Sequence, residues 1–197
     1  MTVTVVMPTI AERHDRFLQA LDSVGRQTVE DVQVFVMPDG PDTALADIIS
    51  ASTAAGVWGL YSNGRVRIIP LGRRWHPPGW GAAQRLVAGY LCETEFMAYL
   101  DDDNIWEPEH LEVLLAAVEG HDFAFSQGRW PTGQIVGEKP EVGYIDTSLV
   151  LHRTELLRTS TWNPADDYIA DGRLFERWAA AGATWACVPR ITMIYRA

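Results

Sequence analysis

The sequence has little cysteine, little positive charge and no long apolar run. Cys92 and Cys187 are the only cysteines, too few for a disulfide scaffold or a zinc site, so the reduced thiols of a cytoplasmic protein are expected. The net charge of −10 argues against a nucleic-acid partner, because phosphate binding needs a basic surface. No apolar run approaches the roughly 18 residues of a membrane span, and the N-terminus lacks the basic region of a signal peptide.

The chain has 197 residues, 47% of them hydrophobic and 21% charged, which is typical of a globular domain with a proper core. Its acidity does not exclude a small anionic ligand, because a divalent cation can link carboxylates to phosphates. The sequence shows no internal repeat, low-complexity segment or linker. We therefore expect a single domain over residues 1–197.

Apolar stretches that favour strands alternate with amphipathic stretches that favour helices in the first part of the chain. Asp42 or Thr43 would cap the second helix, Pro108 suits the first turn of the fourth, and residues 55–63 are expected to be irregular. Four repeats of strand and helix predict an α/β fold, with a largely parallel sheet and helices on both faces. The expected strands are 2–7, 32–37, 66–69, 96–100 and 123–126, and the expected helices are 12–27, 43–54, 82–92 and 107–118.

This alternation ends after residue 127. We expect one domain in two halves, residues 1–126 and residues 127–197. The elements expected in the second half are a turn at 130–133 between short strands, a strand at 148–152, a short helix near Glu155, a helix at 168–181, and strands at 184–188 and 192–195.

Three consecutive aspartates, Asp101, Asp102 and Asp103, follow the expected strand at 96–100. In open α/β sheets, ligands bind outside the carboxyl ends of the strands. Carboxylate oxygens at such a place suit Mg²⁺ or Mn²⁺, often with a bound phosphate completing the coordination shell. The alternative is a solvated acidic turn with no ligand.

Five segments, taken in order, resemble those of family 2 glycosyltransferases. These are GT-A fold enzymes, with a Rossmann-like sheet, that transfer a sugar from a nucleoside diphosphate. The Asp-Asp-Asn-Ile run and the His-Arg pair are similar to the spore-coat polysaccharide type within the family. The segments are Val5-Val6-Met7-Pro8-Thr9 with Arg13, Ala20–Val24 and Gln27-Thr28; residues 35–42; residues 99–111, which include the DXD motif; residues 146–153; and residues 169–178.

The resemblance implies a nucleotide pocket that contains Thr9 and Asp39, with Asp39 accepting the imide N–H of uracil or thymine. It implies that Asp102 contacts the ribose hydroxyls and that Asp103 binds the metal. Asp101 is either a second metal ligand, directly or through water, or a buried partner that holds the loop in place. The structural alternatives are that Thr9 caps the first helix and that Asp39 stabilises a turn.

Asp171 matches the position of the family's general base. The resemblance therefore implies that residues 1–126 are the nucleotide-sugar-binding half and residues 127–197 the acceptor and catalytic-base half. Inverting transfer needs a carboxylate that accepts the proton of the acceptor hydroxyl, with a transition state that resembles an oxocarbenium ion. A carboxylate with an ordinary pKa is already ionised at neutral pH, so placement matters more than tuning. The alternatives are a helix cap or an ion-pair partner of Arg173 or Arg177.

Six further side chains have both a binding and a structural interpretation. The histidine would contact the diphosphate or the acceptor, an arginine would contact phosphate, and the tryptophans would stack on a sugar; packing or solvation is the alternative for each. They are His152, Arg73, Arg74, Arg85, Trp75 and Trp80.

The sequence also departs from the family pattern. Pro38 and Pro41 stand where the family more often has aspartate and serine, which leaves Asp39 to act alone. Tyr195-Arg196-Ala197 lacks the histidine that often follows a Tyr-Arg pair and helps to hold the metal. The metal ligand that this histidine would provide is therefore missing or supplied otherwise. Many relatives continue past this point, so the acceptor side is expected to be minimal, truncated or completed by a second subunit, as in a homodimer.

The prediction is a metal-dependent (Mn²⁺ or Mg²⁺), inverting glycosyltransferase that moves a sugar from a UDP- or dTDP-sugar to the hydroxyl of an unidentified carbohydrate or small-molecule acceptor. A sugar nucleotidyltransferase is one alternative, although its usual glycine-rich signature with a basic residue is absent. A catalytically inactive, nucleotide-binding relative is the other.

Overall fold

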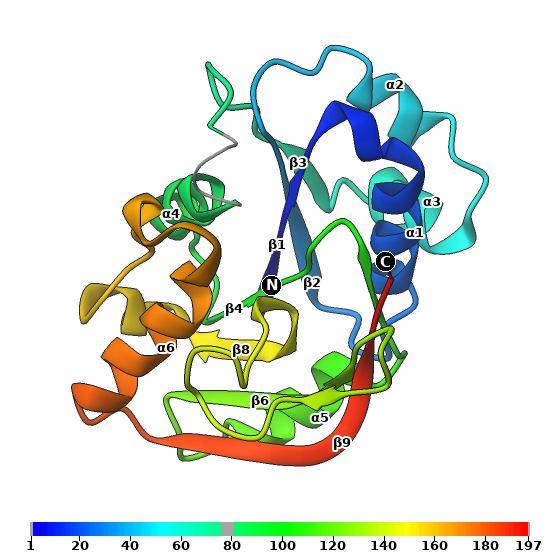
Figure 1. The fold of residues 1–197 in the computed structure, drawn as a ribbon. Helices are drawn as coiled ribbons and strands as arrows, with labels where there is room; N and C mark the ends of the chain where they lie inside the picture. The colour runs from blue at the N-terminus through cyan, green and yellow to red at the C-terminus, as the bar shows by residue number, and fades with distance from the viewer. Residues whose placement is uncertain (1, 76–80, 197) are drawn as a thin grey trace.

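One mixed β-sheet runs through residues 2–75 and 81–196, the part of the chain that the computed structural model describes. The strands are β1 (Val3–Thr9), β2 (Val32–Pro38), β3 (Val66–Ile68), β4 (Phe96–Tyr99), β5 (Asn104–Trp106), β6 (Phe123–Arg129), β7 (Ile135–Val136), β8 (Val150–Arg153) and β9 (Trp185–Tyr195). Their order across the sheet is β3-β2-β1-β4-β8-β6-β9-β5, and β7 pairs with β6 (Figure 1).

The parallel part of the sheet is centred on β1. This strand pairs in parallel with β2 and β4, and β2 pairs in parallel with β3. Every residue of β1 is buried, as expected for a parallel strand that helices cover on both faces. Beyond β4 the sheet is mixed, because β8 is antiparallel to β4 and β6 whereas β9 is parallel to β6. The predicted α/β fold with a mostly parallel sheet is confirmed.

Helices flank the parallel strands on both sides. In Figure 1, α1, α2 and α3 lie on one side of β1 and β2, and α4 and α6 lie on the other. The helices are α1 (His14–Gly25), α2 (Leu45–Ser50), α3 (Ala55–Ser62), α4 (Ala82–Leu91), α5 (His110–Ala117) and α6 (Ala170–Ala180), and the 3₁₀ turns are η1 (Ala11–Arg13), η2 (Thr147–Leu149), η3 (Thr154–Arg158) and η4 (Pro164–Ile169).

The prediction that residues 55–63 are irregular is wrong, because α3 occupies this stretch. Its two glycines weaken the helical signal in the sequence. Gly56 packs so closely on α1 that a Cβ at Gly25 would lie 2.1 Å from the Gly56 carbonyl oxygen. Asp22 of α1 also accepts a hydrogen bond from the Gly56 N–H at 3.0 Å, which satisfies a donor at the start of α3. Tertiary packing therefore stabilises this helix.

Two other helix starts differ from the expectation. The residue that precedes α2 is Ala44, which makes no side-chain cap, and Asp42 instead accepts a hydrogen bond from the Ala44 N–H at 3.2 Å. Pro108 lies two residues before α5, which begins at His110. The chain between the aspartate run and Pro108 forms β5, which pairs antiparallel with β9. This stretch was expected to lead directly into a helix. Because it pairs with the distant β9, it forms a strand instead.

The two closing strands expected from the sequence are one strand, β9. Phe125 of β6 pairs with Cys187, whereas Gln127 pairs with Ile191, so β9 has extra residues between these two points. Such an irregularity tolerates Pro189, which lacks the N–H that a regular ladder needs.

The predicted division at residues 126 and 127 falls within β6 and remains a prediction. Within the described residues, no helix has the length and apolar character needed to cross a bilayer.

Candidate active site

A cleft lies at the carboxyl ends of β1, β2 and β4, and α6 forms its opposite wall. The chain leaves these parallel strands at the same edge of the sheet, so the side chains that follow them converge. The six residues predicted for the site all line this cleft, and they are Thr9, Asp39, Asp101, Asp102, Asp103 and Asp171.

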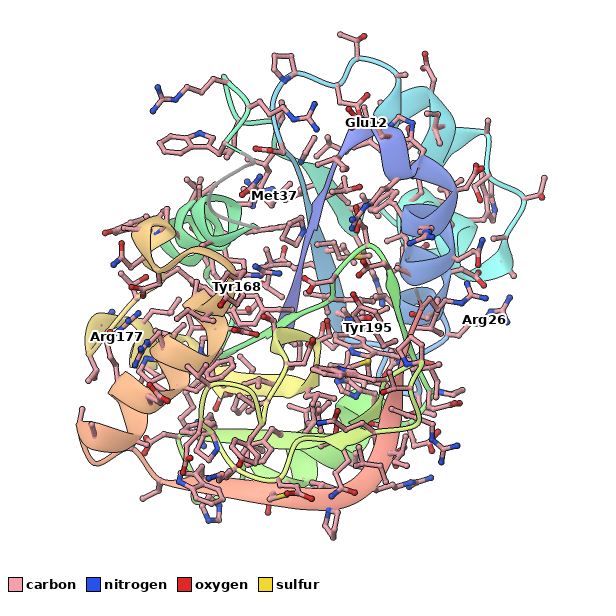
Figure 2. All side chains as sticks on the ribbon, in the orientation of Figure 1. Glu12, Arg26, Met37, Tyr168, Arg177 and Tyr195 are labelled. Carbon is pink, nitrogen blue, oxygen red and sulfur yellow. The ribbon has the colours of Figure 1, made fainter. Side chains whose placement is uncertain are left out.

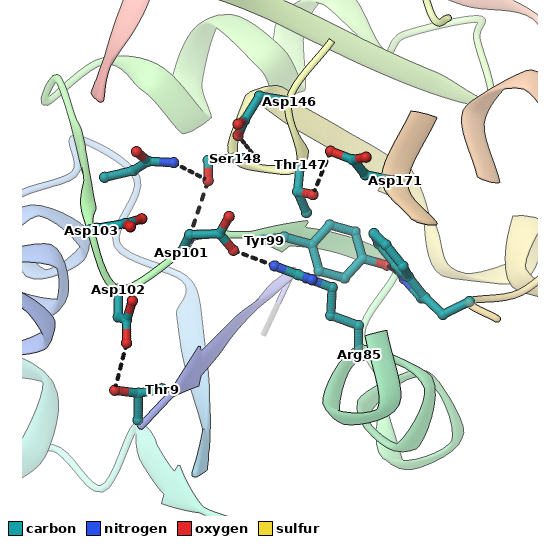
Figure 3. Close-up of polar contacts among 12 residues, drawn as sticks. Thr9, Arg85, Tyr99, Asp101, Asp102, Asp103, Asp146, Thr147, Ser148 and Asp171 are labelled. Carbon is teal, nitrogen blue, oxygen red and sulfur yellow. Dashed lines mark hydrogen bonds and ion pairs between the residues drawn. The ribbon is translucent and has the colours of Figure 1, made fainter. Parts of the chain in front are cut away.

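Thr9, the last residue of β1, is tied to the aspartate run. Its hydroxyl donates a hydrogen bond to Asp102 Oδ2 at 3.0 Å (Figure 3). One guanidinium nitrogen of Arg13 lies 3.0 Å from Asp102 Oδ1 and 3.1 Å from Asp103 Oδ2. Burial raises the pKa of Asp102, and the hydrogen bond from Arg13 opposes this shift. Thr9 therefore positions Asp102 and does not cap the first helix.

Asp39 follows β2 and holds two segments that lie far from it in the sequence. Its Oδ1 accepts hydrogen bonds from the Trp75 N–H at 2.7 Å and from Gln84 Nε2 at 2.9 Å. The carboxylate thus connects the loop after β3 and helix α4 to the rim of the cleft. Asp39 therefore stabilises more than its own turn, which was the structural alternative expected from the sequence.

Asp101 is held from two directions. Its carboxylate pairs with the Arg85 guanidinium, which is 4% exposed and comes from α4. Its backbone N–H donates to Ser148 Oγ at 3.2 Å, and Asn104 Nδ2 donates to the same oxygen at 2.8 Å. This geometry favours the interpretation of Asp101 as a partner that fixes the loop (Figure 3), although its side chain is 32% exposed and so is not buried as expected.

Asp103 has the electrostatic character expected of a cation ligand. Burial and the neighbouring carboxylates of Asp101 and Asp102 raise its pKa to about 6. A bound divalent cation would relieve this repulsion. No three His, Cys, Asp or Glu side chains converge on one point within residues 2–75 and 81–196. The aspartate run therefore fits a cation that is held by one or two carboxylates together with substrate phosphates, which is the usual arrangement for Mg²⁺. It does not fit a cation site made of protein ligands alone.

Asp171 lies in the first turn of α6, across the cleft from the aspartate run. Its Oδ2 accepts a hydrogen bond from Thr147 Oγ1 at 3.1 Å, and its Oδ1 accepts one from the Gly172 N–H at 2.7 Å. Burial raises its pKa, although the Gly172 N–H and Arg85 act in the opposite direction. The pKa is therefore tuned as well as the position.

The proposed arginine partners of Asp171 are engaged elsewhere. Arg173 pairs with Glu176, and Arg177 pairs with Asp166. The ion-pair interpretation of Asp171 is therefore wrong, whereas its bond to the Gly172 N–H retains part of the helix-capping interpretation.

Asp146 is a second carboxylate on the α6 side of the cleft, and sequence reasoning missed it as a site residue. Its Oδ1 accepts a hydrogen bond from the Ser148 N–H at 2.8 Å, which starts the 3₁₀ turn η2. Burial next to the carboxylates of Asp101 and Asp171 raises its pKa to about 7. The one signal in the sequence that could have indicated Asp146 is its place as a charged residue just before the apolar stretch that forms β8.

The loop that carries Asp146 is locked onto helix α6. The Val142 N–H donates to Glu176 Oε1 at 3.1 Å, and a Cβ at Gly172 would lie 2.7 Å from Val142 Cα. Asp146 and Asp171 are therefore held in a fixed relation by contacts outside the cleft.

An Asp146→Asn variant is expected to be more stable than the wild type at alkaline pH. Because the folded-state pKa is about 7 and the unfolded value is about 3.9, the folded state binds more protons between these values, and stability falls as pH rises through this window. Asparagine keeps the oxygen that accepts from Ser148 and does not ionise, so we expect the gain in the free energy of unfolding to be larger at about pH 8 than at about pH 5 by roughly 2–3 kcal/mol. Urea unfolding at both pH values tests this, and a difference that is independent of pH would contradict it.

His152 is a structural residue and does not line the cleft. It is fully buried, and its Nδ1 lies 2.8 Å from the Arg153 carbonyl oxygen while its Nε2 lies 2.7 Å from the Tyr99 hydroxyl. The Tyr99 hydroxyl in turn accepts from Trp162 Nε1 at 3.0 Å. Burial lowers the His152 pKa to about 4, so the ring is neutral. This network supports Trp162, whose ring lines the cleft.

The other candidates divide between the cleft and the surface. Arg85 lines the cleft, whereas Arg74 pairs with the exposed Glu12 and the Arg73 guanidinium stacks 4.2 Å from the centre of the Trp75 ring. Trp80 lies outside the described residues. Sequence reasoning assigned no role to four other lining residues, because their approach depends on distant segments: Arg13, Trp162, Tyr168 and Tyr195.

Comparison with curated proteins finds a relative that is named for succinoglycan biosynthesis. The succinoglycan biosynthesis protein ExoW of Rhizobium meliloti (strain 1021) is 32% identical over 109 residues, which are 55% of this chain and 31% of ExoW. This relative is not of the spore-coat type suggested by the sequence. The chain spans about a third of the length of this relative.

Comparison with solved structures finds the same fold in glycosyltransferases. TarS of S. aureus superposes with a TM-score of 0.78 at 17% identity, covering 100% of this chain and 37% of TarS. TarS 1-349 in complex with UDP-GlcNAc gives 0.75 at 18% identity, covering 100% and 59%. The mannosyltransferase PcManGT from Pyrobaculum calidifontis, in complex with GDP-Man and Mn²⁺, gives 0.76 at 14% identity, covering 98% and 56%. At these identities the likeness shows the fold alone.

The sequence profile of "Glycosyl transferase family 2" matches residues 4–180, which run from within β1 to the end of α6 and include every residue predicted for the site. Because this match covers most of the chain, the protein belongs to glycosyl transferase family 2.

Proposed function

We propose that this protein transfers a sugar from a UDP- or dTDP-sugar to an acceptor hydroxyl, with inversion at the anomeric carbon and with the help of a divalent cation. One observation carries the proposal: the residues predicted to contact the nucleobase, the ribose, the metal and the acceptor's proton all line a single cleft. Carboxylates occupy both walls of the cleft. A donor sugar bound between the walls would have the metal-binding aspartate on one face and the general base Asp171 on the other.

The nucleotide end of the proposed donor site is formed by Thr9, Asp39 and Asp102. Two hydrogen bonds to Oδ1 hold the Asp39 carboxylate at the rim of the cleft, where we place the imide N–H of the nucleobase. Asp102 is fixed by the Thr9 hydroxyl and by Arg13, which leaves it oriented towards the cleft where a ribose would lie. Arg13 adds positive charge close to the position proposed for the diphosphate.

Asp103 would hold the divalent cation together with the diphosphate. When bound, the cation neutralises the negative charge that develops on the departing nucleoside diphosphate. The role of Asp101 as a second ligand remains a prediction, because its carboxylate pairs with Arg85 in this structure. Mn²⁺ accompanies the sugar nucleotide in the complex of PcManGT, which supports this part of the proposal by analogy.

In the proposed reaction, Asp171 accepts the proton of the acceptor hydroxyl. The hydroxyl oxygen forms a bond to the anomeric carbon while the bond from that carbon to the diphosphate oxygen breaks, and its electron pair leaves with the nucleoside diphosphate. The attack comes from the face opposite the leaving group, which inverts the anomeric centre. Thr147 and the Gly172 N–H hold the carboxylate in place for this step.

Titration calorimetry with UDP, dTDP and CDP, each with and without Mn²⁺, tests the donor site. We expect UDP and dTDP to bind about tenfold or more tightly than CDP, because cytosine lacks the imide N–H and an unmatched buried polar group is costly. If none of the three diphosphates binds, the donor-site proposal is wrong. Release of UDP from a UDP-sugar separates glycosyl transfer from nucleotidyl transfer, which would release pyrophosphate.

A further inference from the structure

Tyr168 is an aromatic residue exposed inside the cleft. Its side chain is 74% exposed although it lines the same cavity as Asp171. Figure 2 labels Tyr168 on the segment that leads into α6. A large ring that is left in contact with water inside a concave site marks a place where a ligand binds. This ring is therefore not part of the hydrophobic core.

The segment that carries Tyr168 is anchored from behind. Arg177 of α6 donates to Asp166 Oδ2 at 2.7 Å, to Ser160 Oγ at 2.9 Å and to the Thr161 carbonyl oxygen at 3.2 Å. Trp178 Nε1 donates to the Ser160 carbonyl oxygen at 2.8 Å. These bonds attach the chain on either side of the buried Trp162 to helix α6, so Tyr168 is displayed on a fixed support.

The spacing between Tyr168 and Asp171 places the two side chains on one face. Residues three apart in a helical turn are neighbours, with Cβ atoms about 5–6 Å apart. Tyr168 lies at the end of η4 and Asp171 in the first turn of α6. A ring stacked on Tyr168 would therefore present its edge to the Asp171 carboxylate.

The charge of the cleft restricts what such a ring can be. Aspartates line it at positions 39, 101–103, 146 and 171, against two arginines in the described part of the chain. Arg13 pairs with Asp102 and Asp103, and Arg85 pairs with Asp101. An anionic ring next to Asp146 and Asp171 would be repelled, so a neutral ring with hydroxyl groups fits best.

We propose that Tyr168 is the platform of an acceptor subsite for a neutral pyranoside, which stacks the apolar C–H face of its ring on the tyrosine and directs a hydroxyl to Asp171. This inference rests on the proposed function. The C–H groups of a pyranose face complement the negative face of an aromatic ring, while its hydroxyls can donate to Asp146 and Asp171. The hydroxyl that reaches Asp171 is the one that attacks the donor.

Saturation-transfer NMR with methyl β-D-glucopyranoside and with D-glucuronate, each in the presence of UDP, tests the subsite. The variants are Tyr168→Ala and Tyr168→Leu, which remove the aromatic face, and Tyr168→Phe, which keeps it. Tyr90→Ala is the matched control, because Tyr90 is 81% exposed on α4 and lines a different depression. Thermal unfolding confirms that each variant is folded, and the leucine variant serves if the alanine variant is not.

We expect saturation transfer to the glucopyranoside in the wild type, Tyr168→Phe and Tyr90→Ala, and a loss of about tenfold in its affinity in Tyr168→Ala and Tyr168→Leu. Glucuronate should bind more weakly than the glucopyranoside. Wild-type affinity in the alanine and leucine variants, no signal from the glucopyranoside in the wild type, or equal binding of glucuronate would each overturn the proposal. UDP calorimetry on the same samples reports separately on the donor site, so failure of the subsite and failure of the proposed function are distinguishable.

Discussion

An Asp171→Asn enzyme is expected to lose about 10²- to 10⁴-fold in kcat for release of UDP from a UDP-sugar, while its affinity for UDP stays close to that of the wild type. The amide cannot accept a proton from the attacking hydroxyl or water, and Asp171 lies on the α6 wall of the cleft, away from the residues proposed to bind the nucleotide. The sugar donor for this assay is the one that the wild type hydrolyses fastest in a screen of UDP- and dTDP-sugars.

The control for this prediction is Asp47→Asn, the same chemical change at an exposed position of α2. Asparagine has one oxygen, so it cannot accept from both Thr147 and the Gly172 N–H as Asp171 does. Thermal unfolding therefore accompanies the kinetics. A parallel loss of UDP affinity and of turnover would show that Asp171 is structural, and unchanged turnover would show that it is not the base.

An Asp103→Asn variant is expected to bind UDP with an affinity that no longer responds to Mn²⁺. In the wild type, Mn²⁺ should tighten UDP binding about tenfold or more, because the cation joins the carboxylate to the diphosphate. The pKa of Asp103 is about 6, so protons compete with the cation below this value. The gain from Mn²⁺ should therefore grow as pH rises from about 5 to 7, as measured by calorimetry at both pH values.

Asp101→Asn is the matched variant for this experiment, because Asp101 is adjacent in the sequence but pairs with Arg85. If Asp101 only fixes the loop, its variant keeps most of the response to Mn²⁺ and loses thermal stability. A complete loss of the response in both variants would make Asp101 a second ligand. A full response to Mn²⁺ in Asp103→Asn would show that the cation is held by other residues.

The aspartate run could be predicted as a ligand site because it follows a buried apolar strand, whereas Thr9 and Asp39 were assigned through the resemblance of their segments to the family. The carboxyl ends of parallel strands meet at one edge of a sheet, so adjacency in space follows from strand order and direction. Asp171 was predicted from the resemblance of its segment to the family, since nothing in its local sequence separates a base from a helix cap.

The partners of these residues could not be predicted, because each comes from a distant part of the chain. Arg85 of α4 reaches Asp101, and Thr147 of η2 reaches Asp171. The same holds for α3, whose glycines suggest irregular chain until Asp22 and Gly25 pack against it. Local periodicity reports which face of an element is buried but does not identify the element that covers it.

The sequence by itself determined the fold class, the strand ends that form the proposed donor side and five of the six aspartates that line the cleft. Only the tertiary structure decided how those carboxylates are held and divided. It pairs Asp101 with Arg85, ties Asp102 to Thr9 and Arg13, and brings Asp146 into the cleft. The physical reason is that burial and neighbouring charge set the pKa and the orientation of a carboxylate, and both depend on segments that meet only when the sheet and α6 are assembled.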